Sequence, residues 1–175
     1  DAGNFTLESS TSTWFASSGV VALKPTTYTT SSNVGAVYTA SGQYSGSWPA
    51  STAFDNALSG VNGWIGTNGQ TVGQWVQIQY ASPRTIGRVS FRTNCNGGGN
   101  HAAETILLEG SNDASIYTEL LVATTTKLDG AVAIQVDAAT GLDYFIFSNV
   151  IPYSYYKFTI QSMHSGQQNY TGFCE

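Results

Sequence analysis

Apolar and polar residues alternate one by one in several short stretches of this chain, and no amphipathic helix of useful length is evident. The alternation is clearest in residues 75–80, where Val76 and Ile78 alternate with Gln77 and Gln79. A period of two is typical of β-strands with one buried and one wet face. The same pattern predicts further strands over 88–92, 131–136 and 156–160. The side chains expected inside are Val76, Ile78, Tyr80, Val89, Phe91, Tyr156, Phe158 and Ile160.

Clusters of Gly, Asn, Ser and Asp separate these short strands. Many short strands with turn residues between them predict an all-β fold, an antiparallel β-sandwich or jelly roll, which we place over residues 34–175. Residues 1–33 are rich in Ser and Thr but also carry apolar side chains. They fit either added strands docked on the sandwich or a linker arm. Residues 93–101 form a glycine-rich loop with no phosphate-binding motif.

Composition narrows the partners. The chain has 175 residues, enough for one domain, and only 10% of them are charged, against roughly 25% in ordinary soluble domains. Six basic residues are scattered along a chain of net charge −5. Binding to duplex nucleic acid or to an anionic membrane needs clustered Lys and Arg, so neither is expected. No apolar run is long enough to span a bilayer. A surface of Ser, Thr, Gly, Asn and Gln suits an extracellular or surface-displayed protein.

Motifs for catalysis are missing from the sequence. The two histidines, His101 and His164, form no HxxxH or HExxH arrangement, and no Gly-x-Ser-x-Gly elbow occurs. Most acidic residues fall singly in predicted turns, as Asp113, Asp129 and Asp143 do. We therefore expect a protein that is not an enzyme.

Several segments, in order, carry a resemblance to a known family. Trp48 to Asn56 is followed by Gly63-Trp64 and by Gly73-Gln74-Trp75, which enters an alternating strand. Further along come Thr85 to Val89, Gly110 to Tyr117, Tyr156 to Ile160 and the closing segment Gly166 to Glu175. This succession resembles the discoidin-type jelly-roll domains, which include the factor V/VIII C-type domains and the family 32 carbohydrate-binding modules. The resemblance implies a non-catalytic domain that binds glycans.

The resemblance also implies a calcium ion, chiefly structural, beside the turn at Asp55. Calcium takes six to eight oxygen ligands from carboxylates, carbonyls and hydroxyls. Two departures from the family pattern are that Asn56 stands where glycine is usual, and that the turn is one residue longer. By position, the expected donors are Asp55, the backbone at Ala53 and Leu58, Asn62 and Glu175.

In the family the ligand end is built from loops, which fall here on residues 41–48, 64–74, 93–102 and 164–172. Sugar-binding members use an Arg and an Asn at positions that match Arg92 and Asn100. Ile65 stands where a histidine is expected, and His101 replaces the glycine after the Asn, so His101 is the substitute polar group. Galactose is the sugar type that the resemblance suggests. The full expected ligand set is Arg92, Asn100, His101, Tyr44, Tyr170 and Asn96.

Three tryptophans are assigned to packing. Trp64 and Trp75 are interpreted as core residues rather than stacking platforms, and Trp48 as a packing residue under the first loop. Tyr44 and Tyr170 are the better platform candidates. His164 is interpreted as a surface residue.

Cys95 and Cys174 are the only cysteines, and they form either one disulfide or two free thiols. A bridge between them would pin the third loop. The runner-up function is protein binding, assembly or adhesion through the same loops, with residues 1–33 as an oligomerising arm. Phospholipid binding is least favoured because the loops lack basic residues. Either way, we expect part of a larger multidomain or oligomeric protein.

Overall fold

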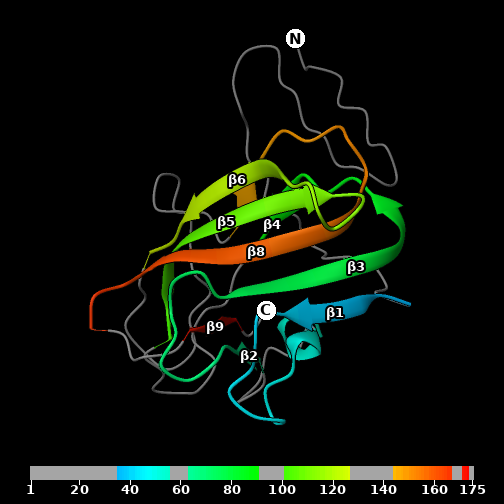
Figure 1. Ribbon diagram of the computed structural model, residues 1–175. Coiled ribbons are helices and arrows are strands. Elements are labelled where there is room, and N and C mark those ends of the chain that lie inside the picture. Colours follow the sequence, from blue (N-terminus) through cyan, green and yellow to red (C-terminus); the bar gives the residue numbers. More distant parts are fainter. Residues whose placement is uncertain (1–34, 56–62, 91–100, 127–143, 167–170, 174–175) are drawn as a thin grey trace.

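A computed structural model describes residues 35–55, 63–90, 101–126, 144–166 and 171–173. The main element is a five-stranded sheet with the strand order β1-β3-β8-β5-β6, in which every neighbouring pair is antiparallel. Figure 1 shows the long strands β3, β5 and β8 side by side. The five strands are β1 (Val37–Ala40), β3 (Trp75–Arg84), β5 (Ala103–Ser111), β6 (Thr118–Thr124) and β8 (Tyr153–Met163).

Shorter elements form the second layer, behind and below the large sheet in Figure 1. Two antiparallel pairs and one 3₁₀ helix contribute to it, and residues from both layers share one core cluster. The expected antiparallel β-sandwich is therefore confirmed. These elements are β2 (Trp64–Ile65) with β9 (Gly172–Phe173), β4 (Arg88–Val89) with β7 (Phe145–Ile146), and the helix η1 (Ala50–Ala53).

Alternation along β3, β5 and β8 builds the core. Every second side chain of these strands faces the second layer, where Trp64 of β2 and Phe145 of β7 meet it. Burial of such apolar side chains is the main favourable term in folding. The innermost large side chains, all less than 2% exposed, include Trp64, Tyr156, Ile78, Ile106, Leu108, Ile160 and Val76.

Predicted strands 75–80 and 156–160 lie within β3 and β8 and are confirmed. Of 88–92, the structure describes Arg88–Val89 as strand β4. Predicted strand 131–136 lies outside the described residues, as do residues 91–92 and the arm 1–33. Of the side chains expected inside, Val76, Ile78, Tyr156, Phe158 and Ile160 are buried, whereas Tyr80 and Val89 are half-buried.

One residue on the outer face of the large sheet is shielded from solvent, although the sequence pattern predicts a solvent-exposed polar face. Gln77 was expected in solvent but is only 7% exposed. Tyr117, from the turn between β5 and β6, donates its hydroxyl to the Oε1 atom of Gln77 at 2.6 Å. The Tyr117 ring centroid also lies 3.6 Å from the Nζ atom of Lys157, which pairs with Glu109 at 2.9 Å. A folded-back aromatic residue thus covers the middle of this face.

Asp113 organises the turn that carries Tyr117. One carboxylate oxygen of Asp113 accepts hydrogen bonds from the backbone N–H groups of Ser115 at 2.8 Å and Ile116 at 2.9 Å. The same oxygen accepts the Ser111 hydroxyl at 3.0 Å. These donors, first of all the two backbone N–H groups, lower the pKa of Asp113 to about 2. The turn lies in the segment Gly110 to Tyr117, one of those that carry the family resemblance.

Tyr156 fixes the connection between β3 and β4. Its buried hydroxyl donates to the carbonyl oxygen of Arg84 and accepts the backbone N–H of Ile86 at 3.2 Å. Burial raises the pKa of the Tyr156 phenol.

Among the described residues, no helix is long and apolar enough to cross a membrane.

Candidate functional site

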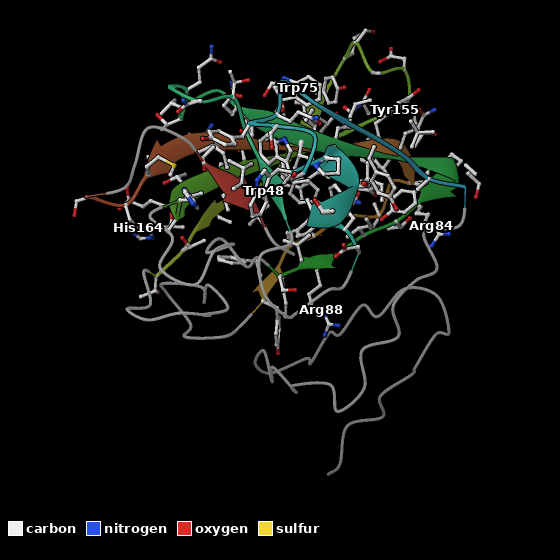
Figure 2. All side chains as sticks on the ribbon, turned by 90° about the horizontal axis from the view of Figure 1, so that it is seen from below. Trp48, Trp75, Arg84, Arg88, Tyr155 and His164 are labelled. Atoms are coloured by element: carbon white, nitrogen blue, oxygen red, sulfur yellow. The ribbon has the colours of Figure 1, made fainter. Side chains whose placement is uncertain are left out.

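Five segments meet at one end of the sandwich. The strand pairings place Ala40 beside Val76, Trp75 beside Thr159, and Ala103 beside Met163. The strands β1, β3, β5 and β8 therefore all have one terminus at the same end of the sheet. Figure 2 shows His164 and Arg84 at opposite ends of the molecule. We call the described loop end the rim; it comprises residues 41–48, 66–74, 101–102, 164–166 and 171.

Hydrogen bonds tie the first rim loop to strand β2. The buried indole N–H of Trp64 donates to the carbonyl oxygen of Gly42 at 2.8 Å. The backbone N–H of Tyr44 donates to the carbonyl oxygen of Ile65, also at 2.8 Å. Because Trp64 is fully buried, the first loop is anchored to the rigid core. The interpretation of Trp64 as a core residue is confirmed.

The second loop is tied to the later segments of the rim. The N–H of Gly66 donates to the carbonyl oxygen of Thr171 at 2.8 Å. The Thr171 hydroxyl donates to the His101 carbonyl oxygen at 3.4 Å. Residues from four separate parts of the chain are thus fixed relative to one another. A site built on fixed backbone loses little conformational entropy when it binds.

Gln74 holds the shape of the second loop and was not singled out from the sequence. It is only 6% exposed. Its Oε1 atom accepts the backbone N–H of Thr67 at 3.2 Å, and its Nε2 donates to Gln70 at 2.8 Å. Gly42 approaches this loop so closely that an added Cβ would lie 2.1 Å from the Thr67 Oγ1 atom. Glycine at position 42 therefore permits the two loops to pack together.

Of the predicted ligand residues, the structure describes Tyr44 and His101. Tyr44 lies on the first loop and is 49% exposed, as a stacking platform needs. His101 is only 3% exposed, so its surroundings favour a packing role over direct contact with a ligand. The prediction that His101 replaces a polar ligand contact stays untested. The others, Arg92, Asn96, Asn100 and Tyr170, lie outside the described residues.

The interpretation of Trp75 as a core residue is wrong. It is half-buried and stands outside the core cluster, because β3 turns Val76 inward and Trp75 to the opposite face. Figure 2 shows Trp75 and Tyr155 on the face of the sheet opposite to Arg88. Trp48 is half-buried and begins the turn into η1, with its N–H donating to the Ser45 carbonyl oxygen at 3.1 Å.

His164 extends the rim at the end of β8 and belongs to a hydrogen-bonded pair. The Thr125 hydroxyl donates to the Ala103 carbonyl oxygen at 2.6 Å. The Nε2 atom of His164 lies 3.1 Å from the same hydroxyl. His164 is half-buried rather than a freely solvated surface residue.

The expected calcium donors are only partly described. Asp55 is exposed and lies just after η1. Ala53, the last residue of η1, is buried, and its carbonyl precedes Asp55 by two residues in the sequence. A carboxylate and a backbone carbonyl are suitable calcium ligands. Within the described ranges no group of three or more His, Cys, Asp or Glu side chains comes together. Leu58, Asn62 and Glu175, with Cys95 and Cys174, lie outside those ranges.

The described rim has no acidic residue, lysine or arginine. Its segments 41–48, 66–74, 101–102, 164–166 and 171 contain mainly hydroxyl, amide, aromatic and glycine residues, with Val72 and Ala102 as aliphatic side chains, and no Asp, Glu, Lys or Arg. Such a surface exchanges hydrogen bonds with neutral hydroxyl groups, and an exposed ring offers a flat apolar face. It offers no charge to a phosphate or to an anionic bilayer.

The described residues define an antiparallel β-sandwich with loops tied together at one end. The F5/8 type C domain model matches residues 37–174, and the chain belongs to this family. Among curated proteins no match was found.

Solved structures of family 32 carbohydrate-binding modules (CBM) share this fold. The family 32 CBM of Clostridium perfringens NanJ, in complex with galactose, is 18% identical with a TM-score of 0.59, covering 80% of this chain and 90% of its own. Chitosan-binding module 1 of a Paenibacillus sp. IK-5 chitosanase/glucanase is 22% identical, with a TM-score of 0.54 and coverages of 78% and 87%. The CBM32 of AlyQ, in complex with 4,5-unsaturated mannuronic acid, is 18% identical, with a TM-score of 0.56 and coverages of 79% and 90%. At these identities the likeness concerns the fold.

Proposed function

We propose that this chain is a non-catalytic carbohydrate-binding module that holds neutral extracellular glycans at the rim. The observation that carries the proposal is the described rim itself, in which amide, hydroxyl and aromatic side chains stand on cross-tied loops without a charged residue. Sugar rings match this chemistry because their hydroxyls donate and accept hydrogen bonds and their C–H faces stack on aromatic rings. Modules of this fold that bind galactose, chitosan or an unsaturated uronic acid support a carbohydrate ligand, and the galactose complex supports a neutral one.

Each residue has a defined role in the proposal. Tyr44 forms the stacking platform, and Arg92 and Asn100 hydrogen-bond the sugar hydroxyls. His101, buried beside Asn100 in sequence, positions the third loop. A neutral pyranose of the galactose type is the first candidate, since the described rim offers hydroxyl, amide and aromatic groups to its hydroxyls and its C–H face.

Calcium has a supporting part in this proposal. Asp55 and the Ala53 carbonyl hold the ion together with Leu58, Asn62 and Glu175, and the ion stiffens the turn that follows η1. The domain works outside the cell. A shallow site binds one sugar weakly, so a parent protein that repeats the module gains affinity by multivalency.

A glycan array tests the proposal. The chain is applied, with and without calcium, to neutral galactosides, chitosan oligomers and uronic-acid oligomers. We expect binding to neutral glycans, and loss of that signal in Tyr44→Ala, Arg92→Ala and Asn100→Ala with unchanged melting. Tyr155→Ala is the matched control, because Tyr155 is a half-buried tyrosine on the outer face of the sheet, away from the rim. The control should bind as the parent chain does.

Two outcomes contradict the proposal. One is an array with no signal on any glycan class. The other is equal loss of signal in Tyr44→Ala and Tyr155→Ala, which would move the site away from the rim. If deletion of residues 1–33 changes the oligomer mass in light scattering while glycans have no effect, the assembly function replaces ours.

A further inference from the structure

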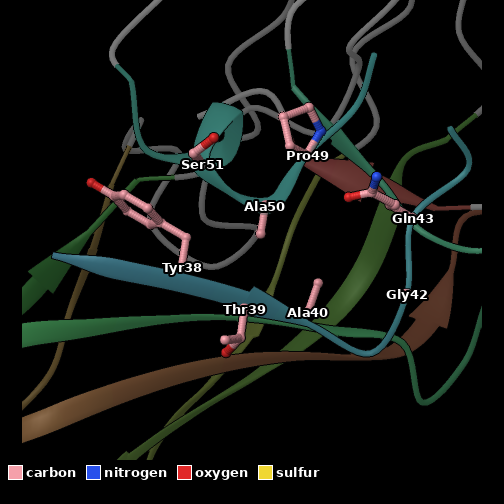
Figure 3. Close-up of a pocket in the computed structure, with 8 residues that line it drawn as sticks. All are labelled: Tyr38, Thr39, Ala40, Gly42, Gln43, Pro49, Ala50 and Ser51. Carbon is pink, nitrogen blue, oxygen red and sulfur yellow. The ribbon is translucent and has the colours of Figure 1, made fainter. Parts of the chain in front are cut away.

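A pocket of about 310 Å³ lies between strand β1 and helix η1 (Figure 3). Tyr38 and Ala40 point from β1 toward η1, and the Gln43 side chain points toward the same space. Thr39 points the opposite way and lines the pocket with its backbone. The eight lining residues are Tyr38, Thr39, Ala40, Gly42, Gln43, Pro49, Ala50 and Ser51.

The register of β1 sets which of its backbone groups bond to β3 and which face the outer edge of the sheet. Ser41 donates its N–H to the Trp75 carbonyl oxygen at 2.9 Å, in line with the β1–β3 ladder. In an antiparallel ladder the residues bonded to the partner alternate with residues whose N–H and C=O point outward. Thr39 therefore bonds toward β3, while Tyr38 and Ala40 turn their N–H and C=O groups outward. No described strand pairs with that edge of β1.

Contacts behind the pocket fix its walls. The Tyr38 ring stacks on Phe54, with centroids 5.4 Å apart and planes inclined at 22°. The Thr52 hydroxyl donates to the Pro49 carbonyl oxygen at 2.6 Å, which holds the first turn of η1. Gly42 is anchored by the Trp64 indole, as described above. The pocket is thus formed before any ligand arrives.

The lining selects a small, neutral and polar ligand. Tyr38, Gln43 and Ser51 supply a phenol, an amide and a hydroxyl, whereas Pro49 and Ala50 supply apolar surface. None of the eight lining residues carries a charge, so a phosphate or carboxylate gains no counter-charge there. A volume of about 310 Å³ is at the lower end of ligand sites, which span about 300–1,000 Å³, and suits a group the size of one sugar ring.

The pocket is continuous with the rim, because Gly42 and Gln43 belong to both. Tyr44, the proposed platform, is the next residue along the chain. We propose that the β1–η1 pocket is a second subsite, which binds the neighbouring ring of a neutral oligosaccharide whose terminal ring occupies the rim. The inference rests on the proposed function and adds a ligand length, at least two linked rings.

Backbone NMR of the ¹⁵N-labelled chain separates the two subsites. Galactose, glucose, mannose and N-acetylgalactosamine are titrated, each followed by its β-linked homodisaccharide. Two sets of amide signals are followed, those of residues 66–74 for the rim and those of residues 38–40 and 50–51, which lie outside the rim, for the pocket. We expect a monosaccharide to shift the rim set, and the disaccharide of the same sugar to shift both sets and bind about tenfold more tightly.

Substitutions give the second readout. Gln43→Ala removes the amide and Ala50→Phe fills the pocket; each should reduce disaccharide affinity to within about twofold of the monosaccharide affinity of the same variant. Ala50 is not a rim residue, so Ala50→Phe should leave monosaccharide affinity unchanged. Gln161→Ala is the matched control, an exposed glutamine on β8. Gln43 is exposed on a loop, so Gln43→Ala keeps the test valid if Ala50→Phe folds poorly.

Each result decides between the two proposals. Shifts confined to the rim with every sugar overturn the pocket subsite and leave the proposed function in place. Shifts confined to the pocket overturn the rim assignment and, with it, the idea of a second subsite. No shift with any sugar overturns both. Equal disaccharide affinity in Gln43→Ala and Gln161→Ala also overturns the subsite.

Discussion

Tyr156→Phe removes one oxygen atom from the core and leaves the ring in place. That oxygen accepts the Ile86 N–H and donates to the Arg84 carbonyl oxygen, and the Tyr156 side chain is 0% exposed. A buried polar group left without a partner costs about 1–3 kcal/mol. Taking about 2 kcal/mol, we expect the melting temperature to fall by about 4–8 °C, since each kcal/mol shifts a domain of this size by about 2–4 °C.

Thermal melting followed by circular dichroism, with urea unfolding as a second assay, measures this loss. Tyr155→Phe is the control, because Tyr155 is the adjacent residue on the opposite, half-buried face of β8; its change should stay within about 0.5 kcal/mol. The Tyr156 hydroxyl lies at the end of the sheet away from the rim, so glycan affinity well below the melting temperature should not change. Equal destabilisation by both substitutions would refute the assignment.

Three further predictions concern the rim, the turn and the metal. Gly172→Ala places a Cβ 2.3 Å from the Trp64 carbonyl oxygen. This substitution should lower the free energy of unfolding, measured in urea, by about 1–3 kcal/mol and abolish the array signal. Gly46→Ala is the control, because a Cβ there has nothing within 4 Å, and it should change neither quantity. Asp113→Ala should lower the melting temperature at neutral pH. Because folding lowers the Asp113 pKa to about 2, this contribution is present above the ordinary carboxyl pKa and is lost as the pH falls toward about 2; a deficit that persists at that pH contradicts it. A chelator should lower the melting temperature of the parent chain and have no effect on Asp55→Ala; an unchanged parent melt would dispose of the calcium proposal.

Alternation in the sequence was sufficient to predict two of the three long strands. In β3 and β8, side chains that face the core are consistently apolar, so a period of two is visible in the sequence and the buried set follows from it. Trp64 could be assigned to the core only through the family resemblance, because β2 is two residues long and has no alternation of its own. Strand β5 escaped a residue-level prediction, since the half-buried Leu107 stands between the buried Ile106 and Leu108 and three apolar residues in a row hide the alternation.

Long-range contacts set the limit of that reasoning. Gln77 alternates as a wet residue should, yet Tyr117, 40 positions away, folds back over it. Nothing near Gln77 in sequence announces that cover. Gln74 likewise gives no local signal, because its side chain serves backbone and amide groups of its own loop. The pocket depends on how closely η1 approaches β1, which is a property of the tertiary structure.

Lys157 has a consequence for handling the protein. Its amine lies against the Tyr117 ring and is paired with Glu109, with its side chain 20% exposed. Amine-reactive dyes and coupling reagents need an accessible amine, so they should modify this position slowly. Lys24 and Lys127 are the only other lysines. Coupling to a sensor surface through amines should therefore leave Lys157 largely unmodified, and a tag attached at this position would require an introduced cysteine or a different chemistry.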